Sequence, residues 1–147
     1  TCVNKRSGWL LIPIFGWYLK KIGSISIKRN KITKDNLGFF EDIDKIISNS
    51  KRPLIIFPQG TRVLPNERPP FKKGASRIYE ELKIPCQPVA INSGYVWPKV
   101  GLKKIHKSIT ISILKPIDAG LSKDTFVNTL ENKIYSELDF FDLYFPQ

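Results

Sequence analysis

The most informative stretch of the chain is Leu54-Ile55-Ile56-Phe57-Pro58-Gln59-Gly60-Thr61-Arg62. Its first residues form an apolar run that predicts a buried strand, and a tight turn follows the strand. At the turn, Gly60 lets the backbone approach a ligand closely, Thr61 adds a hydroxyl group, and Arg62 offers a planar fork that can bind two phosphate oxygens. The stretch indicates a phosphate-binding turn, although an ordinary strand-end turn with a surface arginine has the same residue types.

Three further blocks surround this turn in order. They are Gly23-Ser24-Ile25-Ser26-Ile27-Lys28-Arg29 upstream, then Pro69-Pro70-Phe71-Lys72-Lys73-Gly74-Ala75 and Pro85-Cys86-Gln87-Pro88-Val89-Ala90-Ile91-Asn92 downstream. In this combination the chain resembles the phospholipid/glycerol acyltransferase family, and most closely those members that acylate 1-acylglycerol-3-phosphate. The similarity covers residues 11–92 and matches the second, third and fourth of the family's four sequence blocks.

The chain departs from the family pattern at two places. Gln59 stands where the family usually has glutamate; an amide can hold the same turn, but it brings no charge and adds two donors. The first block, His-x4-Asp, is missing, because the only histidine, His106, lies after the other blocks and no aspartate follows it at this spacing. We therefore expect His106 to be a solvated residue of a basic loop and not a catalytic base.

The missing first block also bears on the extent of the protein. The sequence contains no methionine, and the family's histidine–aspartate block would precede the matched ones. We therefore expect the chain to be the C-terminal part of a longer protein, with residues 1–147 forming a single acyltransferase domain that lacks its N-terminal part. Such a chain would contain no catalytic residue and would be inactive alone.

The resemblance implies a reaction and a set of binding residues. The reaction moves a fatty acyl group from acyl-CoA or acyl-carrier protein to lysophosphatidic acid and makes phosphatidic acid for phospholipid biosynthesis, without a cofactor or a metal. Other acceptors, such as glycerol-3-phosphate or a lysophospholipid, remain open. The implied substrate-binding residues are Arg29, Gln59, Gly60, Thr61, Arg62 and Lys72. Pro88 and Val89 would line the path of the acyl chain.

The charge of the chain is high and uneven. The net charge is +11; residues 1–116 hold 22 Lys and Arg against 7 Asp and Glu, a net +15, while residues 117–147 hold 2 against 6, a net −4. A basic body suits a membrane surface with anionic lipid, a phosphorylated substrate or an acyl thioester, and plain solubility would also account for it. Nucleic acid fits by charge alone, and since no binding signature accompanies the charge, we expect none as a partner.

No segment is long enough to cross a bilayer. An uncharged, largely apolar stretch at residues 7–19 has 13 residues against the ~20 that a spanning helix needs. It is rich in aromatic and aliphatic residues and is followed by Lys20 and Lys21, which fits the membrane interface as well as a helix packed in the core. We expect association with the cytoplasmic face of a membrane without a transmembrane helix in this chain. A non-catalytic membrane-surface binding module is the alternative function.

Periodicity predicts the order of the elements. We expect strands at 24–28, 54–57, 87–92 and 109–114, and helices at 35–49, at 74–83 and from Ser122 onward. The first strand, helix and second strand would make a strand–helix–strand unit with parallel strands. The predicted fold class is α/β, with a mixed or mostly parallel sheet flanked by helices. Cys2 and Cys86 provide no disulfide framework, and no Cys/His cluster indicates a metal site.

Overall fold

The computed structural model describes residues 3–4, 17–18, 21, 25–26, 43, 45, 47, 49, 53–98, 101 and 108–144. The chain divides into two compact units, Thr1–Phe57 and Pro58–Gln147. The prediction of one domain over residues 1–147 concerns how these units fold together, and it stays a prediction.

The first unit contains a short parallel pair of strands. β1 (Val3–Asn4) and β2 (Ile25–Ser26) pair in register, and β2 falls within the predicted strand at 24–28. Within the predicted helix at 35–49, the described residues are helical; they are Ile43, Lys45, Ile47 and Asn49. Ile43 is fully buried while Lys45 is exposed, as expected for a helix with one apolar face.

The segment 54–57 differs from its predicted form. Only Ile55 takes part in a β-bridge, and the side chains of Ile55 and Phe57 are 51% and 66% exposed. The prediction of a buried strand here is therefore wrong, and the strand–helix–strand unit that would end in this segment stays a prediction. An apolar run shows only that side chains are suited to burial, whereas a buried strand also needs partners along its edges and cover on both faces.

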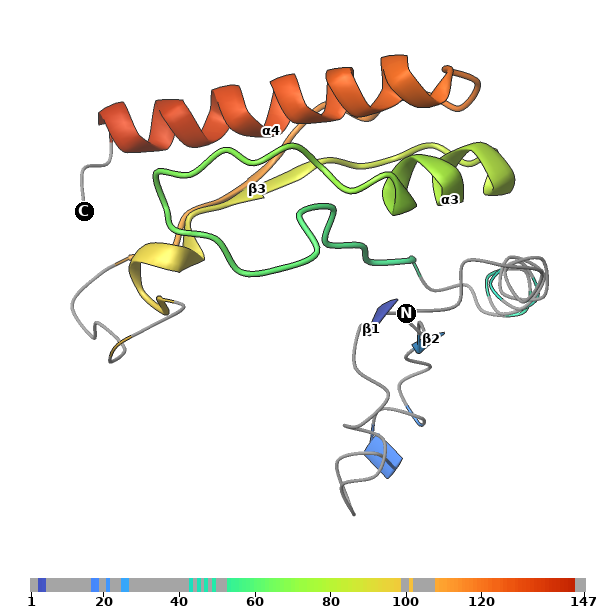
Figure 1. Cartoon of the computed structure of the whole chain (residues 1–147), viewed down its shortest axis with the longest axis horizontal. Coiled ribbons are helices and arrows are strands. Elements are labelled where there is room, and N and C mark those ends of the chain that lie inside the picture. The colour runs from blue at the N-terminus through green and yellow to red at the C-terminus, as the bar shows by residue number, and fades with distance from the viewer. Residues whose placement is uncertain are drawn as a thin grey trace. The chain divides into compact units, whose positions relative to one another are not determined.

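The second unit contains the longer elements, and they confirm the two helices and two strands that were predicted after residue 73. In chain order they are α3 (Gly74–Leu82), β3 (Val89–Ile91), the 3-10 helix η2 (Ser93–Tyr95), β4 (Ile111–Ile113) and α4 (Lys123–Tyr144). β3 and β4 pair antiparallel, with Val89 opposite Ile113. Helix α4 lies along both α3 and β3 (Figure 1). Helices beside small sheets give an α/β fold, as predicted.

Helix α4 begins at Lys123, directly after Ser122, where its start was predicted. The Oγ atom of Ser122 accepts a hydrogen bond of 3.3 Å from the Thr125 N–H, which caps the first turn. Phe126 and Leu130 are buried, and near the C-terminal end of the helix Phe141 is 3% exposed.

One hydrophobic cluster holds the second unit together. Its buried members are Phe71, Tyr79, Ile117, Phe126 and Leu130. The rings of Tyr79 and Phe126 stack with centroids 3.8 Å apart and planes 10° from parallel. Burying each large apolar side chain contributes about 1.5–3 kcal/mol. Because Phe71 comes nine residues after Arg62, this cluster fixes the far end of the segment that follows the turn.

Candidate functional site

The turn at residues 58–62 has the backbone that its sequence predicts. Gly60 has a φ of 68°, the left-handed region in which a side chain costs about 1–2 kcal/mol. Thr61 and Arg62, which follow it, are exposed. The glycine therefore allows a sharp reversal that leaves a hydroxyl and a guanidinium facing solvent.

A backbone hydrogen bond closes the segment that starts at the turn. The N–H of Lys72 donates to the carbonyl of Pro58 at 2.8 Å, so residues 58–72 form a closed loop, here called the 58–72 loop. The side chain of Lys72 is exposed. Five of the predicted substrate-binding residues lie on this loop: Gln59, Gly60, Thr61, Arg62 and Lys72. The sixth, Arg29, lies outside the described residues.

A second, tighter turn lies inside the 58–72 loop. The N–H of Glu67 donates to the carbonyl of Leu64 at 3.0 Å, and the N–H of Leu64 donates to the Glu67 carboxylate, also at 3.0 Å. These two bonds satisfy three backbone groups of an exposed segment, the N–H and carbonyl of Leu64 and the N–H of Glu67. They give the middle of the loop one defined shape.

One face of α4 binds the 58–72 loop. Its contact residues, spaced by four, four and three positions so that they share a helix face, are Glu131, Tyr135, Asp139 and Asp142. Glu131 accepts the Phe71 N–H at 2.5 Å, and the Tyr135 hydroxyl donates to the carbonyl of Pro69. The helix thus takes up backbone groups of the loop directly.

Arg68 is the centre of the contact between the loop and α4. Its Nη2 lies 2.8 Å from Asp142 and 2.9 Å from Asp139, and its Nε donates to Asp139 at 3.0 Å. Its Nη1 donates to the carbonyl of Pro65. The Arg68 side chain is 21% exposed, so these charge-assisted bonds are only partly screened by water.

Two tyrosines join the same network. The Tyr95 hydroxyl donates to the second carboxylate oxygen of Asp142 at 2.8 Å. Burial raises the pKa of Tyr95, the hydrogen bond and charge of Asp142 raise it further, and Arg68 lowers it. Burial also raises the pKa of Tyr135, which a hydrogen bond with Gln59 and the charge of Arg68 oppose. Both phenols therefore stay protonated, as donors, at neutral pH.

The effect of Gln59 on Tyr135 shows what the amide at this position does. A hydrogen bond that lowers the pKa of a phenol is one that the phenol oxygen accepts. The Gln59 side chain therefore lowers the pKa of the Tyr135 phenol as a nearby donor would, while the Tyr135 hydroxyl donates to Pro69. A glutamate, the usual residue of the family here, could donate only when protonated.

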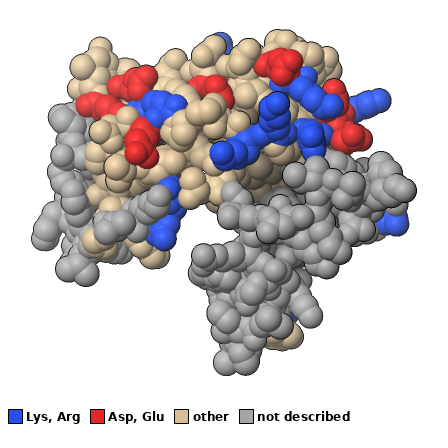
Figure 2. Space-filling view, in the orientation of Figure 1, with Lys and Arg blue, Asp and Glu red and all other residues tan. Residues whose placement is uncertain are grey.

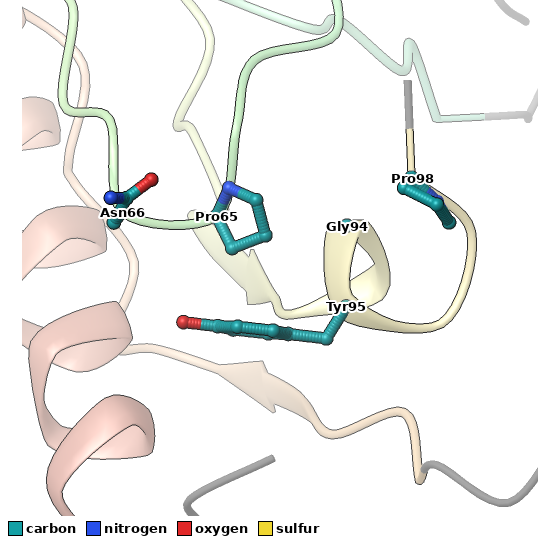
Figure 3. Close-up of a pocket in the computed structure, with 5 residues that line it drawn as sticks. All are labelled: Pro65, Asn66, Gly94, Tyr95 and Pro98. Carbon is teal, nitrogen blue, oxygen red and sulfur yellow. The ribbon is translucent and has the colours of Figure 1, made fainter. Parts of the chain in front are cut away.

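A cavity of about 410 Å³ lies beside this network. Its lining residues are Pro65, Asn66, Gly94, Tyr95 and Pro98 (Figure 3). Figure 3 shows the Tyr95 ring lying along the cavity with its hydroxyl directed away from Gly94, in keeping with the bond to Asp142. Among the described residues that line the cavity, none has a charged side chain, so this part of the cavity is a poor candidate for the phosphate group.

The two residues predicted to line an acyl path differ in exposure. Pro88 is among the fully buried side chains, whereas Val89 is 43% exposed. Val89 shares a face of the β3–β4 sheet with three exposed isoleucines, because pairing sets Val89 opposite Ile113 and Ile91 opposite Ile111. This face offers apolar surface, and the roles of Pro88 and Val89 stay predictions.

The aromatic segment of the first unit is exposed where it is described. Trp17 and Tyr18 are helical and 65% and 54% exposed, and the Lys21 Nζ lies 4.8 Å from the centroid of the Trp17 ring. None of the helices among the described residues has both the length and the apolar character to cross a membrane. His106 lies outside the described residues.

Acidic and basic side chains are interleaved on the second unit. Figure 2 shows groups of Lys and Arg with Asp and Glu beside them. Arg68 forms ion pairs with Asp139 and Asp142, and the Lys123 Nζ lies 2.5 Å from a Glu80 carboxylate oxygen. The acidic C-terminal part of the sequence is therefore partly paired with the basic part.

The network around Arg68 was not predicted from the sequence. A usable signal was present, since the C-terminal segment of a basic chain carries Glu131, Tyr135, Asp139 and Asp142 at the spacing of one helix face. What the sequence could not show is that this face meets Arg68, which is 71 positions before Asp139.

Comparison with known proteins identifies the family. Residues 2–92 match the family model described as Acyltransferase. The 1-acyl-sn-glycerol-3-phosphate acyltransferase of Saccharomyces cerevisiae is 34% identical over 127 residues, which is 83% of this chain and 41% of the relative. The enzymes of the same name from Helicobacter pylori and Escherichia coli are each 31% identical, over 86% and 80% of this chain and 53% and 47% of their own lengths.

A solved structure shows the same fold. The 1-acyl-sn-glycerophosphate acyltransferase PlsC from Thermotoga maritima superposes with a TM-score of 0.77 at 19% identity, over 97% of this chain and 56% of that one. The chain spans about half the length, or less, of the curated relatives named above. Since the family model alone matches well over half of its residues, the chain belongs to the acyltransferase family.

Proposed function

We propose that the complete gene product transfers a fatty acyl group from acyl-CoA or acyl-carrier protein to the free hydroxyl of 1-acylglycerol-3-phosphate and so makes phosphatidic acid. The observation that carries this proposal is the 58–72 loop, which presents Arg62 and Lys72 from a turn fixed by Gly60. The printed names of the relatives support the choice of acceptor.

The reaction has a simple balance. The acceptor oxygen attacks the thioester carbonyl, a C–O bond forms, the C–S bond breaks, and the hydroxyl proton ends on the departing thiol. The base that the family resemblance implies is a histidine of the His-x4-Asp block, which has no counterpart among the 147 residues here. The residues of this chain bind and orient the acceptor.

The acceptor phosphate is the group that the 58–72 loop suits. The guanidinium of Arg62 can bind two phosphate oxygens, and Lys72 adds a second positive charge beside the closed base of the loop. Each charge-assisted contact contributes about 1.5–3 kcal/mol. Arg29 would add a further contact by resemblance alone.

The acyl chain requires an apolar surface, in contrast to the charged groups that bind the phosphate. The exposed face of the β3–β4 sheet, with Val89 and its isoleucine neighbours, supports a path for the chain there. Pro88 is buried and would shape this path from beneath. Trp17 and Tyr18, exposed beside Lys21, support work at a membrane surface with anionic lipid, on its cytoplasmic face.

The test is an acceptor comparison with the complete gene product. Purified protein is given a labelled acyl thioester and either 1-acylglycerol-3-phosphate, glycerol-3-phosphate or lysophosphatidylcholine, and the labelled lipids are separated. We expect phosphatidic acid from the first acceptor and little product from the others. Preference for another acceptor would reassign the substrate, while vesicle binding without any turnover would favour the non-catalytic membrane-binding module.

A further inference from the structure

We propose that Arg68 is a positioning residue that holds the 58–72 loop against α4 in the shape that binds the acceptor phosphate. The proposal rests on the proposed function for the identity of the acceptor. It adds a role for a residue outside the matched motifs, and for the aspartates of the C-terminal segment.

Hydrogen bonds with Arg68 and with side chains of α4 fix backbone groups along most of the second half of the 58–72 loop. The carbonyl of Pro65 accepts from Arg68, the carbonyl of Pro69 accepts from Tyr135, and the N–H of Phe71 donates to Glu131. Arg68 also lies over the Tyr135 ring, with its guanidinium carbon 5.8 Å from the centroid. Four side chains of α4, spread over about three helical turns, thus hold a segment that has no helix or strand of its own.

The same contacts extend to the turn itself. The Gln59 side chain, next to Gly60, is near enough to lower the pKa of Tyr135, and the Tyr135 hydroxyl donates to Pro69 at the other side of the loop. Arg62 is only six positions from Arg68, and Lys72 only four. Contacts that fix the position of Arg68 therefore also limit the positions of Arg62 and Lys72, the two cations that would bind the phosphate.

Holding a loop in its binding shape before the ligand arrives lowers the entropy lost on binding. Loss of the restraint should therefore weaken acceptor binding more than the chemical step. We expect the KM for the acceptor to rise about tenfold, with the KM for the thioester nearly unchanged. Arginine is needed because one planar fork meets two carboxylates and a carbonyl, which an ammonium group cannot do with the same geometry.

The experiment compares variants of the complete gene product. Arg68→Gln removes the charge, Arg68→Lys keeps it, and Asp142→Asn removes the partner's charge at similar volume. Lys123→Gln is the matched control, because it breaks an exposed ion pair between α4 and α3 without touching the loop. Two readouts are taken: separate KM values for the two substrates, and amide hydrogen exchange at Phe71, Lys72 and the α3 cap Lys83.

The proposal expects a defined pattern. Arg68→Gln and Asp142→Asn should raise the acceptor KM and speed exchange at Phe71 and Lys72, with Lys83 unchanged; Arg68→Lys should recover part of both effects. Unchanged loop exchange would overturn the restraint, and faster exchange with an unchanged acceptor KM would reduce Arg68 to a structural residue. If the unmodified protein showed no turnover, the proposed reaction and its acceptor would be refuted. If amide exchange at Phe71 and Lys72 still depended on Arg68 in that case, the role of Arg68 in holding the 58–72 loop would stand on its own.

Discussion

The guanidinium of Arg68 lies 2.8 Å from a carboxylate oxygen of Asp142, 74 positions later in the chain. The other oxygen of the same carboxylate accepts the Tyr95 hydroxyl, also at 2.8 Å. One aspartate near the end of α4 therefore joins the 58–72 loop to the 3-10 helix η2 that follows β3. Because Arg68 and Asp142 are partly buried, their pairing is screened less than a surface ion pair.

The two aspartates that Arg68 contacts should differ in their effect on stability. Asp142→Asn should lower the free energy of unfolding by about 1–3 kcal/mol, because it weakens bonds to both Arg68 and Tyr95. Asp139→Asn should cost less than about 1 kcal/mol, since the Asp139 side chain is 66% exposed. Urea denaturation of the two variants measures the difference. Equal losses would mean that burial does not distinguish the two contacts.

The phenol of Tyr95 should make stability fall at alkaline pH. Its pKa in the folded protein lies above the ordinary value of 10.0, so the native state keeps the proton longer than the unfolded state. The contribution of the protonated Tyr95 phenol to the free energy of unfolding is fully present below about pH 10. It is lost as the pH rises through the pKa of Tyr95 in the folded protein. Tyr95→Phe should remain closer to its neutral-pH stability than the unmodified protein does.

The alkaline effect is measured from urea midpoints between pH 8 and pH 11. Tyr144→Phe serves as the control because Tyr144 is 63% exposed at the end of α4. Parallel pH profiles for Tyr95→Phe and the unmodified protein would contradict this prediction, because they would mean that folding does not raise the pKa of Tyr95.

The cap of α4 should contribute to stability independently of the Arg68 network. Ser122→Ala removes the oxygen that accepts the Thr125 N–H and should cost about 1 kcal/mol. Ser136→Ala, at an exposed position inside the same helix, should be neutral or slightly stabilising because alanine is the better helix former. Thermal unfolding followed by circular dichroism compares the two. A larger loss for Ser136→Ala would contradict the assignment of Ser122 as the cap.

The sequence predicted the second unit well because its signals are local. Helix α4 has a capping serine and an apolar stripe, and β4 has alternating isoleucines, so each element is specified by its own residues. The turn at Gly60 was predictable for the same reason. The segment 54–57 failed because the burial of a strand depends on its neighbours, which an apolar run does not specify.

The contacts of the candidate site were only partly predictable. The residues of the turn follow one another in sequence, so their proximity needs no tertiary information. The attachment of the 58–72 loop to α4 brings Phe71 to Glu131, 60 positions apart, and Arg68 to Asp142. Such pairs are set by how helix α4 packs on the core, and no spacing rule within either segment predicts them.

The aromatic segment of the first unit should bind membranes. Trp17→Ser should reduce binding to vesicles that contain anionic lipid, because Trp17 is exposed beside Lys21. Trp97→Ser is the matched control, since Trp97 is 67% exposed in the second unit. Sedimentation with vesicles at low and high salt measures both effects, and salt should weaken binding. Equal binding to neutral vesicles, or an equal loss for Trp97→Ser, would contradict this prediction.

The most direct test of acceptor recognition by the 58–72 loop is the catalytic efficiency of Arg62→Ala toward lysophosphatidic acid, measured in the complete gene product. If Arg62 binds the acceptor phosphate, its loss removes about 1.5–3 kcal/mol, or about one to two powers of ten in kcat/KM for the acceptor. Arg62→Lys should restore only part of this efficiency, and Arg77→Ala, an exposed arginine on α3, should stay near normal. Near-normal efficiency in a folded Arg62→Ala variant would contradict the account, because the turn would then be structural and the phosphate would be bound elsewhere.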